Sequence, residues 1–409
     1  MMRPLVLPPR PACRLVMMMM TTTVMLAALG AAPTSPAWAA GGGYRTRVGE
    51  GSAALPLVVV KGTPYEMGLA QGRLMKEEVR ATLPRFLHYA QASGDPRFAD
   101  AALDQAWATS APYTDKRMIA MMHGVADGSG LGWDAVRRAH AIPLVASYSC
   151  SGVAAWGKAT KDGHLLQIRN LDYYMGSGLQ DHPLLVVYLP DQGIAHIEAT
   201  FAGAVGCQTG MNAEGIALTL IGDSPNRESP FDVKGEHFFS IFRAILFDAH
   251  NLDQALAILK KSQRIKKYHY VIGDGKIPAA VKIRAHAPEL RIWKDDDPQD
   301  ELAPDIFKNL VCHAETRTPT ALAHIRLNYG AYDSDRMMQL ARAIGMAGKN
   351  LLSVVYDASA LELWVAYAQK EASAYRQPFV HVRMKDYLDF NKRPAGAVVF
   401  ESQATPTSH

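Results

Sequence analysis

The spacing of hydrophobic residues changes near position 150. Before it, apolar residues recur every three or four positions, as on one face of a helix. After it, short apolar runs separated by turn residues predict strands. The predicted helices cover about 64–84, 99–110, 114–127 and 133–142, then 237–249, 252–262 and 333–345; the predicted strands cover 152–156, 165–170, 184–189, 196–201, 216–221, 268–272, 281–285, 290–293, 351–356 and 361–367.

The first helix has a well-marked beginning. An apolar run at 55–61 predicts a strand just ahead of it. Thr63 can cap the helix, Pro64 suits its first turn, and Glu66 can complete a capping box. We expect Pro84 to kink or end this helix, because proline has no N–H to donate.

Turn signals between the strands indicate antiparallel pairing. Asp162-Gly163 is typical of a tight hairpin, and 212–215 has the composition of a second turn. Hairpin strands followed by pairs of helices predict an α+β protein, in which helices cover antiparallel sheets. The glycine-rich stretch 128–132 follows a helical pattern rather than a strand, so it is predicted to be a turn and not a phosphate loop.

The first 39 residues have the order of a secretory signal peptide. Three arginines and no acid precede or open an apolar stretch, and Ala37-Trp38-Ala39 supplies a small-residue cleavage site. The apolar stretch is interrupted and short for a membrane span, although a retained anchor is the alternative. We therefore expect an exported protein, periplasmic or secreted, that is not an integral membrane protein, and we expect 41–43 to form a flexible leader.

Composition excludes several classes of protein. Charged residues are 20% and hydrophobic residues 48%, which is typical of a globular chain and not of a disordered one. Four cysteines in 409 residues are too few for a disulfide scaffold. The net charge is +4, and the signal peptide contributes three of those charges, so no nucleic-acid partner is expected.

Cys150 lies where the helical front meets the first hairpin. A free cysteine in a junction loop is a candidate nucleophile, although most free cysteines are simply buried. The return strand of the hairpin ends in Arg169-Asn170-Leu171-Asp172, which antiparallel pairing would bring back beside Cys150. Arg169 could favour the thiolate, and Asp172 could orient an amine. A structural Arg169–Asp172 ion pair is the alternative.

Four short motifs occur in a fixed order along the chain. They are C-S-G at 150–152, D-G at 162–163, R-N-L-D at 169–172 and G-M-N-A-E-G at 210–215. In this order they resemble cysteine amino-terminal-nucleophile (Ntn) hydrolases, the group of bile-salt (choloylglycine) hydrolase, penicillin V acylase, acid ceramidase and isopenicillin-N acyltransferase. The stretches 60–72 and 350–365 are similar to the acyl-CoA:6-aminopenicillanate acyltransferase branch, peptidase C45.

The resemblance implies a fold and a maturation step. The fold of this family is a four-layer αββα sandwich, and precursors with a long front segment cut themselves just before the nucleophile. Here the bond would join Ser149 to Cys150, which divides the mature protein into a helical segment, 40–149, and a catalytic core, 150–409. The released α-amino group of Cys150 would then act as its own general base, since its ordinary pKa lies near neutrality.

The resemblance also implies roles for individual residues. Cys150 is the nucleophile, Arg169 and Asp172 support the thiol and the amine, and Asn212 helps to hold the oxyanion; Asn212 is also a natural turn residue. A second oxyanion asparagine is missing, and His313 occupies the corresponding strand. His313 is also the residue we would nominate if the enzyme were papain-like. The Cys150-to-Arg169 spacing is three residues wider than expected for bile-salt hydrolases, which predicts a bulge at 156–160.

These inferences lead to one main function and several alternatives. We expect a self-processing cysteine hydrolase that cleaves a linear amide of a small N-acyl or lipid substrate through a thioester. Two catalytic alternatives use the same site: acyl transfer, and lipid ester hydrolysis as in phospholipase-B-like proteins. A further alternative is a binding protein without catalytic activity. No cofactor or metal is expected. The two fragments would form a heterodimer, and a higher oligomer stays open.

Removal of the signal peptide would leave three cysteines. An odd number in an oxidising compartment requires at least one unpaired thiol, consistent with a free Cys150. A bridge between Cys207 and Cys312 is open on sequence grounds.

Overall fold

The computed structural model describes residues 41–147, 149–222, 233–285, 289–300, 305 and 307–401. The predicted signal peptide lies outside these residues. As predicted, helices dominate before residue 149, and strands dominate after it. The front part holds β1 (Gly42–Val48), β2 (Leu55–Gly62), α1 (Pro64–Leu74), α2 (Lys76–Ala92), α3 (Asp100–Ser110), α4 (Lys116–Ser129) and α5 (Trp133–Val145).

The larger sheet combines strands from both parts of the chain. Its order in the described residues is β11-β10-β9-β8-β7-β6-β5-β2-β1-β16. Neighbours pair antiparallel except β2 and β5, which run parallel. The strands beyond the front part are β5 (Pro183–Pro190), β6 (His196–Phe201), β7 (Thr209–Asn212), β8 (Ile216–Ile221), β9 (Tyr268–Asp274), β10 (Ala279–Ala285), β11 (Leu290–Trp293) and β16 (Val398–Glu401).

The smaller sheet carries the first hairpin. Its order is β12-β3-β4-β13-β14-β15, with antiparallel pairing throughout the described strands. A register shift between Ala155 and Gly157 confirms the predicted bulge, and Gly157 has a positive φ of 52°. The strands are β3 (Ser149–Gly157), β4 (Gly163–Asp172), β12 (Leu310–His313), β13 (Asn350–Asp357), β14 (Glu362–Tyr367) and β15 (Val380–Arg383).

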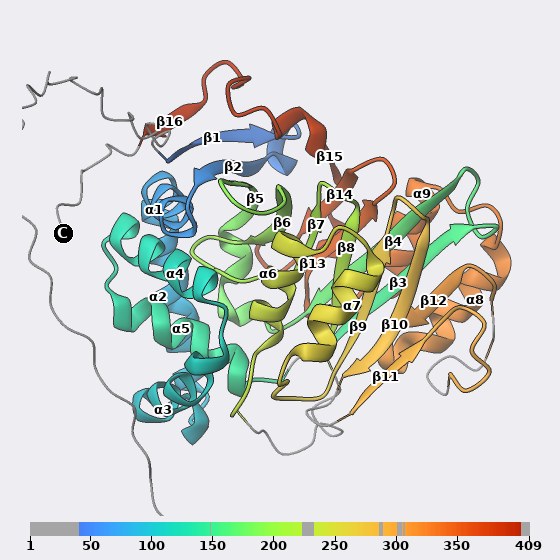
Figure 1. The fold of residues 1–409 in the computed structure, drawn as a ribbon, viewed down its shortest axis with the longest axis horizontal. Coiled ribbons are helices and arrows are strands. Elements are labelled where there is room, and N and C mark those ends of the chain that lie inside the picture. The colour runs from blue at the N-terminus through green and yellow to red at the C-terminus, as the bar shows by residue number, and fades with distance from the viewer. Residues whose placement is uncertain are drawn as a thin grey trace, which may run out of the picture. The chain divides into compact units, whose positions relative to one another are not determined.

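The two sheets pack face to face between layers of helices (Figure 1). β3 and β4 of the smaller sheet contact β8 and β9 of the larger one. α6 (Phe238–Asp248) and α7 (Leu252–Lys261) cover the outer face of the larger sheet, while α8 (Thr318–Asn328) and α9 (Ser334–Ala343) cover the smaller one. The predicted α+β class with four αββα layers is confirmed.

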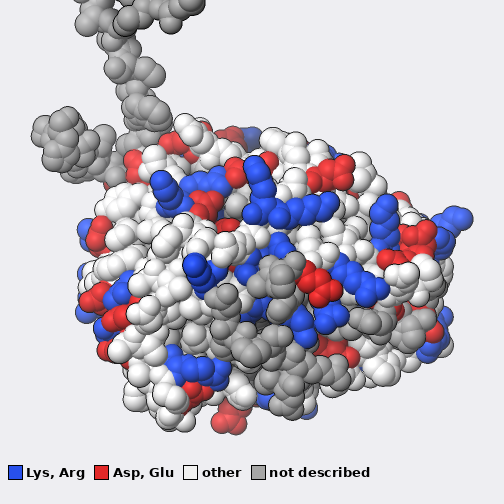
Figure 2. Space-filling view, turned by 60° about the horizontal axis from the view of Figure 1, so that its bottom comes forward, with Lys and Arg blue, Asp and Glu red and all other residues white. Residues whose placement is uncertain are grey.

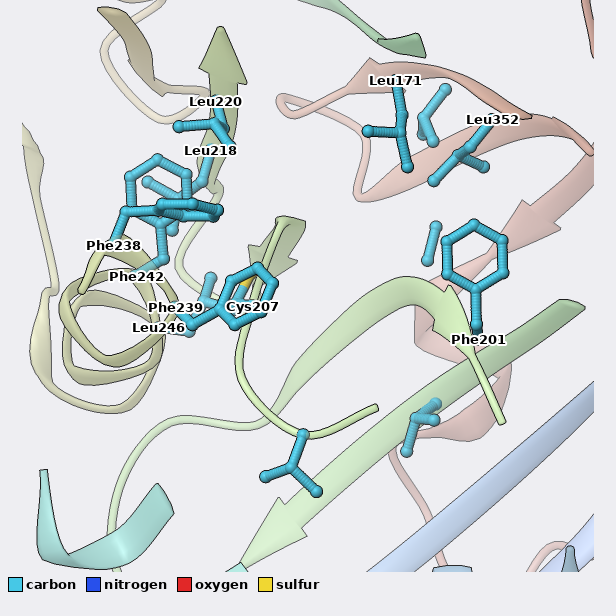
Figure 3. Packing of buried hydrophobic residues seen from close by; sticks show 14 of the residues in the cluster. Leu171, Phe201, Cys207, Leu218, Leu220, Phe238, Phe239, Phe242, Leu246 and Leu352 are labelled. Carbon is cyan, nitrogen blue, oxygen red and sulfur yellow. The ribbon is translucent and has the colours of Figure 1, made fainter. Parts of the chain in front are cut away.

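The hydrophobic core fills the spaces between these layers. Figure 3 shows aromatic side chains of α6, among them Phe238 and Phe242, packed near Leu218 and Leu220 of β8. These side chains are fully or almost fully buried. Because β8 is buried on both faces, its sequence is apolar at every position except Thr219, whose hydroxyl donates to the Ile168 carbonyl.

The first helix begins as predicted. The Thr63 hydroxyl accepts the Glu66 N–H at 3.3 Å, and the Glu66 carboxylate accepts the Thr63 N–H at 2.8 Å. Pro84 neither ends nor breaks a helix, because α2 continues through it to Ala92, and the break comes instead at Met75 between α1 and α2. The expected helix end at Pro84 is therefore wrong, and a kink there stays a prediction.

The prediction of a flexible leader at 41–43 was also wrong. β1 begins at Gly42 and pairs with both β2 and β16. A Cβ atom on Gly42 would lie 2.8 Å from the carbonyl oxygen of Phe400, and one on Gly43 would lie 2.8 Å from that of Val59. The glycines therefore allow close packing of neighbouring backbone rather than flexibility.

Helices α1 and α4 approach each other unusually closely. A Cβ atom on Gly68 would lie 2.2 Å from the carbonyl oxygen of Met121, and one on Gly124 would lie 2.2 Å from that of Tyr65. Only glycine fits at these two positions. Across the described ranges, no helix is both long and apolar enough to cross a membrane.

Candidate active site

Cys150 lies near the start of β3, directly opposite Leu171 of β4. Its side chain is fully buried and belongs to the main core cluster, together with Ala154 and Leu165. Val153 and Ala155, which alternate with these positions, belong to the second cluster beneath α8 and α9. The thiol therefore faces the space between the two sheets.

Arg169 lies two residues before Leu171 on β4, so both side chains lie on the face of the sheet that Cys150 shares. It is fully buried, and within the described residues none of its three guanidinium nitrogens has a hydrogen-bond partner. A buried cation without a partner is costly, so its surroundings favour any anion that forms beside it. Its charge lowers the pKa of the Cys150 thiol against other effects, which indicates that the two groups are close.

The surroundings of the Cys150 thiol favour its protonated form on balance. Burial raises the pKa of the thiol above its ordinary value, and the carboxylates of Asp172 and Glu315 raise it further. Arg169 and a backbone hydrogen bond from Gly222, directly after β8, act in the opposite direction. The Arg169 guanidinium and the Gly222 backbone N–H can therefore both stabilise a negative charge on the sulfur.

Asp172 ends β4 and is held from three sides. Oδ1 accepts the Met346 N–H at 3.2 Å and the Asn350 side-chain amide at 3.1 Å. Oδ2 accepts Nη1 of Arg317 at 2.5 Å. The partner of Asp172 is therefore Arg317, and the alternative of an Arg169–Asp172 ion pair does not occur. Arg169 and Asp172 both lie near Cys150, as the sequence predicts, but in separate roles.

Two charged side chains hold the backbone of Cys150. The carboxylate of Glu315 accepts the Cys150 N–H at 3.0 Å, and Nη2 of Arg317 donates to the Cys150 carbonyl at 2.9 Å. The Ser149 hydroxyl also hydrogen bonds to Glu315, so this carboxylate touches both sides of the Ser149–Cys150 bond. Neither Glu315 nor Arg317 was predicted from the sequence. The sequence does place an acidic residue, Glu315, and a basic residue, Arg317, two positions apart, shortly after the strand that ends at His313.

An apolar pocket opens beside Leu171, the residue paired with Cys150. Leu171, the ladder partner of Cys150, lines it together with Phe86, Ile142 and Phe239. Ala146 and Tyr173 line both this pocket and a wider cleft of about 560 Å³ beside α2. Ala146 and Tyr173 therefore lie between the apolar pocket and the cleft.

The structure does not bring Asn212 to Cys150. Its amide nitrogen donates to the carbonyls of Leu246 and Ala249 at 3.3 and 2.9 Å, at the end of α6. Its amide oxygen accepts two N–H groups of the following turn, from Glu214 and Ile216. Asn212 thus points toward the helix layer, on the face of the larger sheet opposite the smaller sheet. Its observed role is that of a turn residue.

His313 ends β12, opposite Gly152 of β3. It is buried, and its ring packs 4.3 Å, centroid to centroid, from the ring of His269 on β9. His313 therefore lies between the sheets near the start of β3. Neither the oxyanion role nor the papain-like role is tested by these contacts.

Among the described residues, Cys207 and Cys312 form no bridge. Cys207 and Cys312 are both free and buried, and they lie in different core clusters, Cys207 in the main cluster and Cys312 in the cluster beneath α8 and α9. Figure 3 shows Cys207 beside Phe239 and Leu246. The open question of a Cys207–Cys312 disulfide is therefore answered in the negative.

A stretch that begins after Cys150 matches a known enzyme family. Residues 158–295 match acyl-coenzyme A:6-aminopenicillanic acid acyl-transferase. The predicted resemblance to this family is confirmed. The matched stretch begins after Cys150 and includes Arg169, Asp172 and Asn212.

Curated relatives extend the similarity beyond the stretch matched by the acyl-transferase family. Protein dcd1B of Dictyostelium discoideum is 27% identical over 311 residues, which is 69% of this chain and 61% of that protein. Protein dcd1A of the same organism is 26% identical, over 63% of this chain and 64% of that protein. The alignments thus leave more than a third of each relative unmatched.

Solved structures of Ntn hydrolases show a weaker likeness. A Caenorhabditis elegans ortholog of N-acylethanolamine-hydrolyzing acid amidase is 14% identical, with a TM-score of 0.42, over 56% of this chain and 98% of that one. Penicillin V acylase from Agrobacterium tumefaciens is 11% identical, with a TM-score of 0.41, over 59% of this chain and 89% of that one.

Proposed function

We propose that this chain is an exported, self-processing cysteine hydrolase that cleaves a linear amide bond through a thioester on Cys150. The observation that carries the proposal is the surroundings of one residue. The thiol of Cys150 lies beside a buried, unpartnered guanidinium, and its backbone N–H and C=O are held by Glu315 and Arg317. A structural cysteine needs none of these groups.

The acyl part of the substrate would bind in the pocket beside Leu171. The pocket is lined mostly by apolar side chains, so it suits a hydrocarbon or aromatic acyl group rather than a charged one. Cleavage after Ser149 would free the carboxyl end of the segment that carries Ala146, which lines both this pocket and the wider cleft. The substrate would then reach Cys150 from the cleft.

Acyl transfer is the second candidate, and the family match favours it. Residues 158–295 match an acyl-transferase family, and a thioester can react with an amine as well as with water. Hydrolysis stays the main proposal because water is abundant in an exported compartment. Ester lipids are the remaining alternative for the same nucleophile.

The first test examines the chain itself. On a denaturing gel, the purified protein should give two fragments, and amino-terminal sequencing of the larger should begin at Cys150. A Cys150→Ala variant should stay uncut. Cys312→Ala, which removes another buried thiol, should cut normally. A wild-type chain that stays whole would count against self-processing and in favour of a binding protein.

The second test examines the substrate. The processed protein should hydrolyse N-acyl amino acids and N-acyl amines, with a rate that depends on acyl-chain length. Including free amines in the assay distinguishes transfer from hydrolysis, because transfer yields a new amide. Matched esters distinguish lipid ester hydrolysis. A protein that is cut but inactive on all three classes would overturn the proposed activity while leaving self-processing intact.

A further inference from the structure

The position of Glu315 follows from the way that the β3–β12 ladder ends. β12 pairs with β3 from Leu310 to His313, and the last pair joins His313 to Gly152. Two residues further along the same register, Glu315 would stand opposite Cys150. At Glu315 the backbone has a φ of 51°, in the left-handed region, and the chain turns away into α8.

A side chain therefore takes the place of the next ladder bond. In a regular ladder, a backbone carbonyl would accept the Cys150 N–H. Here the carboxylate of Glu315 accepts it at 3.0 Å, and the same carboxylate bonds to the Ser149 hydroxyl. The difference matters chemically, since a carboxylate can take up and release a proton and a backbone carbonyl cannot.

The charged groups around Glu315 suit a proton carrier. Burial raises the pKa of Glu315 to about 7, and the hydrogen bonds from Cys150 and Ser149 act in the opposite direction. Arg317 lowers this pKa, whereas Asp172 raises it. Glu315 also raises the pKa of the Cys150 thiol, and its carboxylate bonds to the backbone N–H of the same residue.

We propose that Glu315 is the proton carrier of self-cleavage, taking the proton of the Cys150 thiol and passing it to the Cys150 nitrogen. The sulfur attacks the Ser149 carbonyl carbon, the bond from that carbon to nitrogen breaks, and the leaving nitrogen gains the proton that the thiol lost. The product is a thioester and a free amine, with no external reactant. Water then hydrolyses the thioester, giving the Ser149 carboxylate and the free thiol. This inference rests on the proposed self-processing.

The test follows cleavage of the full chain after cell-free synthesis, by gel, over time. Glu315→Gln keeps an oxygen that can accept the Cys150 N–H but cannot carry the proton. It should slow cleavage by about 100-fold or more, the usual contribution of general acid–base catalysis. Thr316→Ala, an exposed change in the same turn, should cut at the wild-type rate. Thermal unfolding of each variant in a Cys150→Ala chain shows whether the turn still folds.

The pH profile separates a proton carrier from a structural residue. The carrier starts as a carboxylate, so with a pKa of about 7 the wild-type rate should rise by about 30-fold from pH 5.5 to pH 8. Glu315→Gln should lose that rise, and Glu315→Asp should keep it at a lower rate. The charged groups that face Glu315, Asp172 and Arg317, are unchanged in both variants.

Each outcome decides a different claim. If the wild-type chain never cuts, the proposed self-processing fails. If the wild-type chain cuts and Glu315→Gln cuts as fast, self-processing stands and the role of Glu315 is overturned. Equal, pH-independent rates in the Asp and Gln variants would also overturn it, because the carboxylate in Asp would then contribute nothing. A slow Gln variant with a normal unfolding temperature supports it.

Discussion

At the scale of single residues, Arg169 shows a conflict between stability and chemistry. Its guanidinium is fully buried, and in the described part of the chain it has no hydrogen-bond partner. Such a group destabilises the folded state unless an anion forms beside it. The anion that the proposed reaction supplies is the thiolate or the oxyanion at Cys150.

Replacing Arg169 by methionine should therefore separate the two effects. In an uncut Cys150→Ala chain, Arg169→Met should raise the free energy of unfolding by about 1–3 kcal/mol, because a lone buried charge is replaced by an apolar side chain. In the chain with Cys150, the same change should lower amide hydrolysis by about 100-fold or more. Urea unfolding and the hydrolysis assay measure these effects. A less stable variant would show that Arg169 is a structural residue.

His140 gives a prediction about pH. Its Nδ1 lies 2.7 Å from the Val136 carbonyl, and its Nε2 accepts the Val205 N–H at 2.8 Å, so the ring is neutral. Burial lowers the pKa of His140 from 6.5 to about 4. Stability from this residue is complete above pH 6.5 and is lost as the pH falls toward 4, by about 3 kcal/mol. His140→Gln should be less stable at pH 7 but should lose less stability between pH 6.5 and 4. Equal pH slopes in urea titrations would contradict this.

At the scale of secondary-structure elements, the contact of α1 with α4 depends on glycine. Gly124→Ala would place a methyl group 2.2 Å from the Tyr65 carbonyl, so the helices would have to move apart. We expect a loss of about 2–3 kcal/mol in the free energy of unfolding, measured by urea denaturation. Lys116→Ala, an exposed change in the same helix, should alter it by less than about 0.5 kcal/mol. Similar values for the two variants would mean that the helices adapt at no cost.

Most of the elements could be predicted because their apolar spacing is regular. The strands β6, β8 and β11 have the predicted bounds, and the Asp162-Gly163 turn joins β3 to β4. The elements that were not predicted include β1, β7, α8, β15 and β16. β7 and β16 have only four residues each, too few to show a period, and α8 has a weak apolar face.

The candidate site could be predicted in part. One hairpin carries Cys150, Arg169 and Asp172. The turn and strand signals in the sequence were therefore enough to predict that these residues lie close together. Glu315 and Arg317 lie more than 160 residues after Cys150 in the chain. They reach Cys150 because the backbone at Glu315 has a positive φ, which no sequence pattern predicts. Asn212 was given a chemical role because a turn residue and an oxyanion donor look alike in sequence.

At the scale of the whole molecule, the proposed front fragment is built into the fold. The segment 40–149 is not only helical, since it supplies β1 and β2 to the larger sheet, between β5 and β16 of the core. β2 itself is buried along most of its length. The outer surface is unlike this interior, and Figure 2 shows basic and acidic side chains interspersed on one face.

The two fragments should therefore stay together after cleavage. We expect them to elute as one species from a sizing column, even in about 1 M salt, because the two fragments share one apolar core, and salt screens only the charged contacts between them, such as Arg117–Asp248. They should separate only under denaturing conditions. Native mass spectrometry gives the stoichiometry, and a front fragment lost in salt would contradict this account of the sheet.

The place of β1 and β2 inside the larger sheet also has a consequence for refolding. Pairing β2 with β5 requires a long crossover, and in the uncut chain covalent continuity keeps that search within one molecule. After cleavage, the same pairing becomes an encounter between two separate chains. We expect the Cys150→Ala chain to recover its native fold after heating, whereas the processed protein would recover poorly and in proportion to its concentration. Maturation would then turn an equilibrium fold into one that persists mainly because it unfolds slowly.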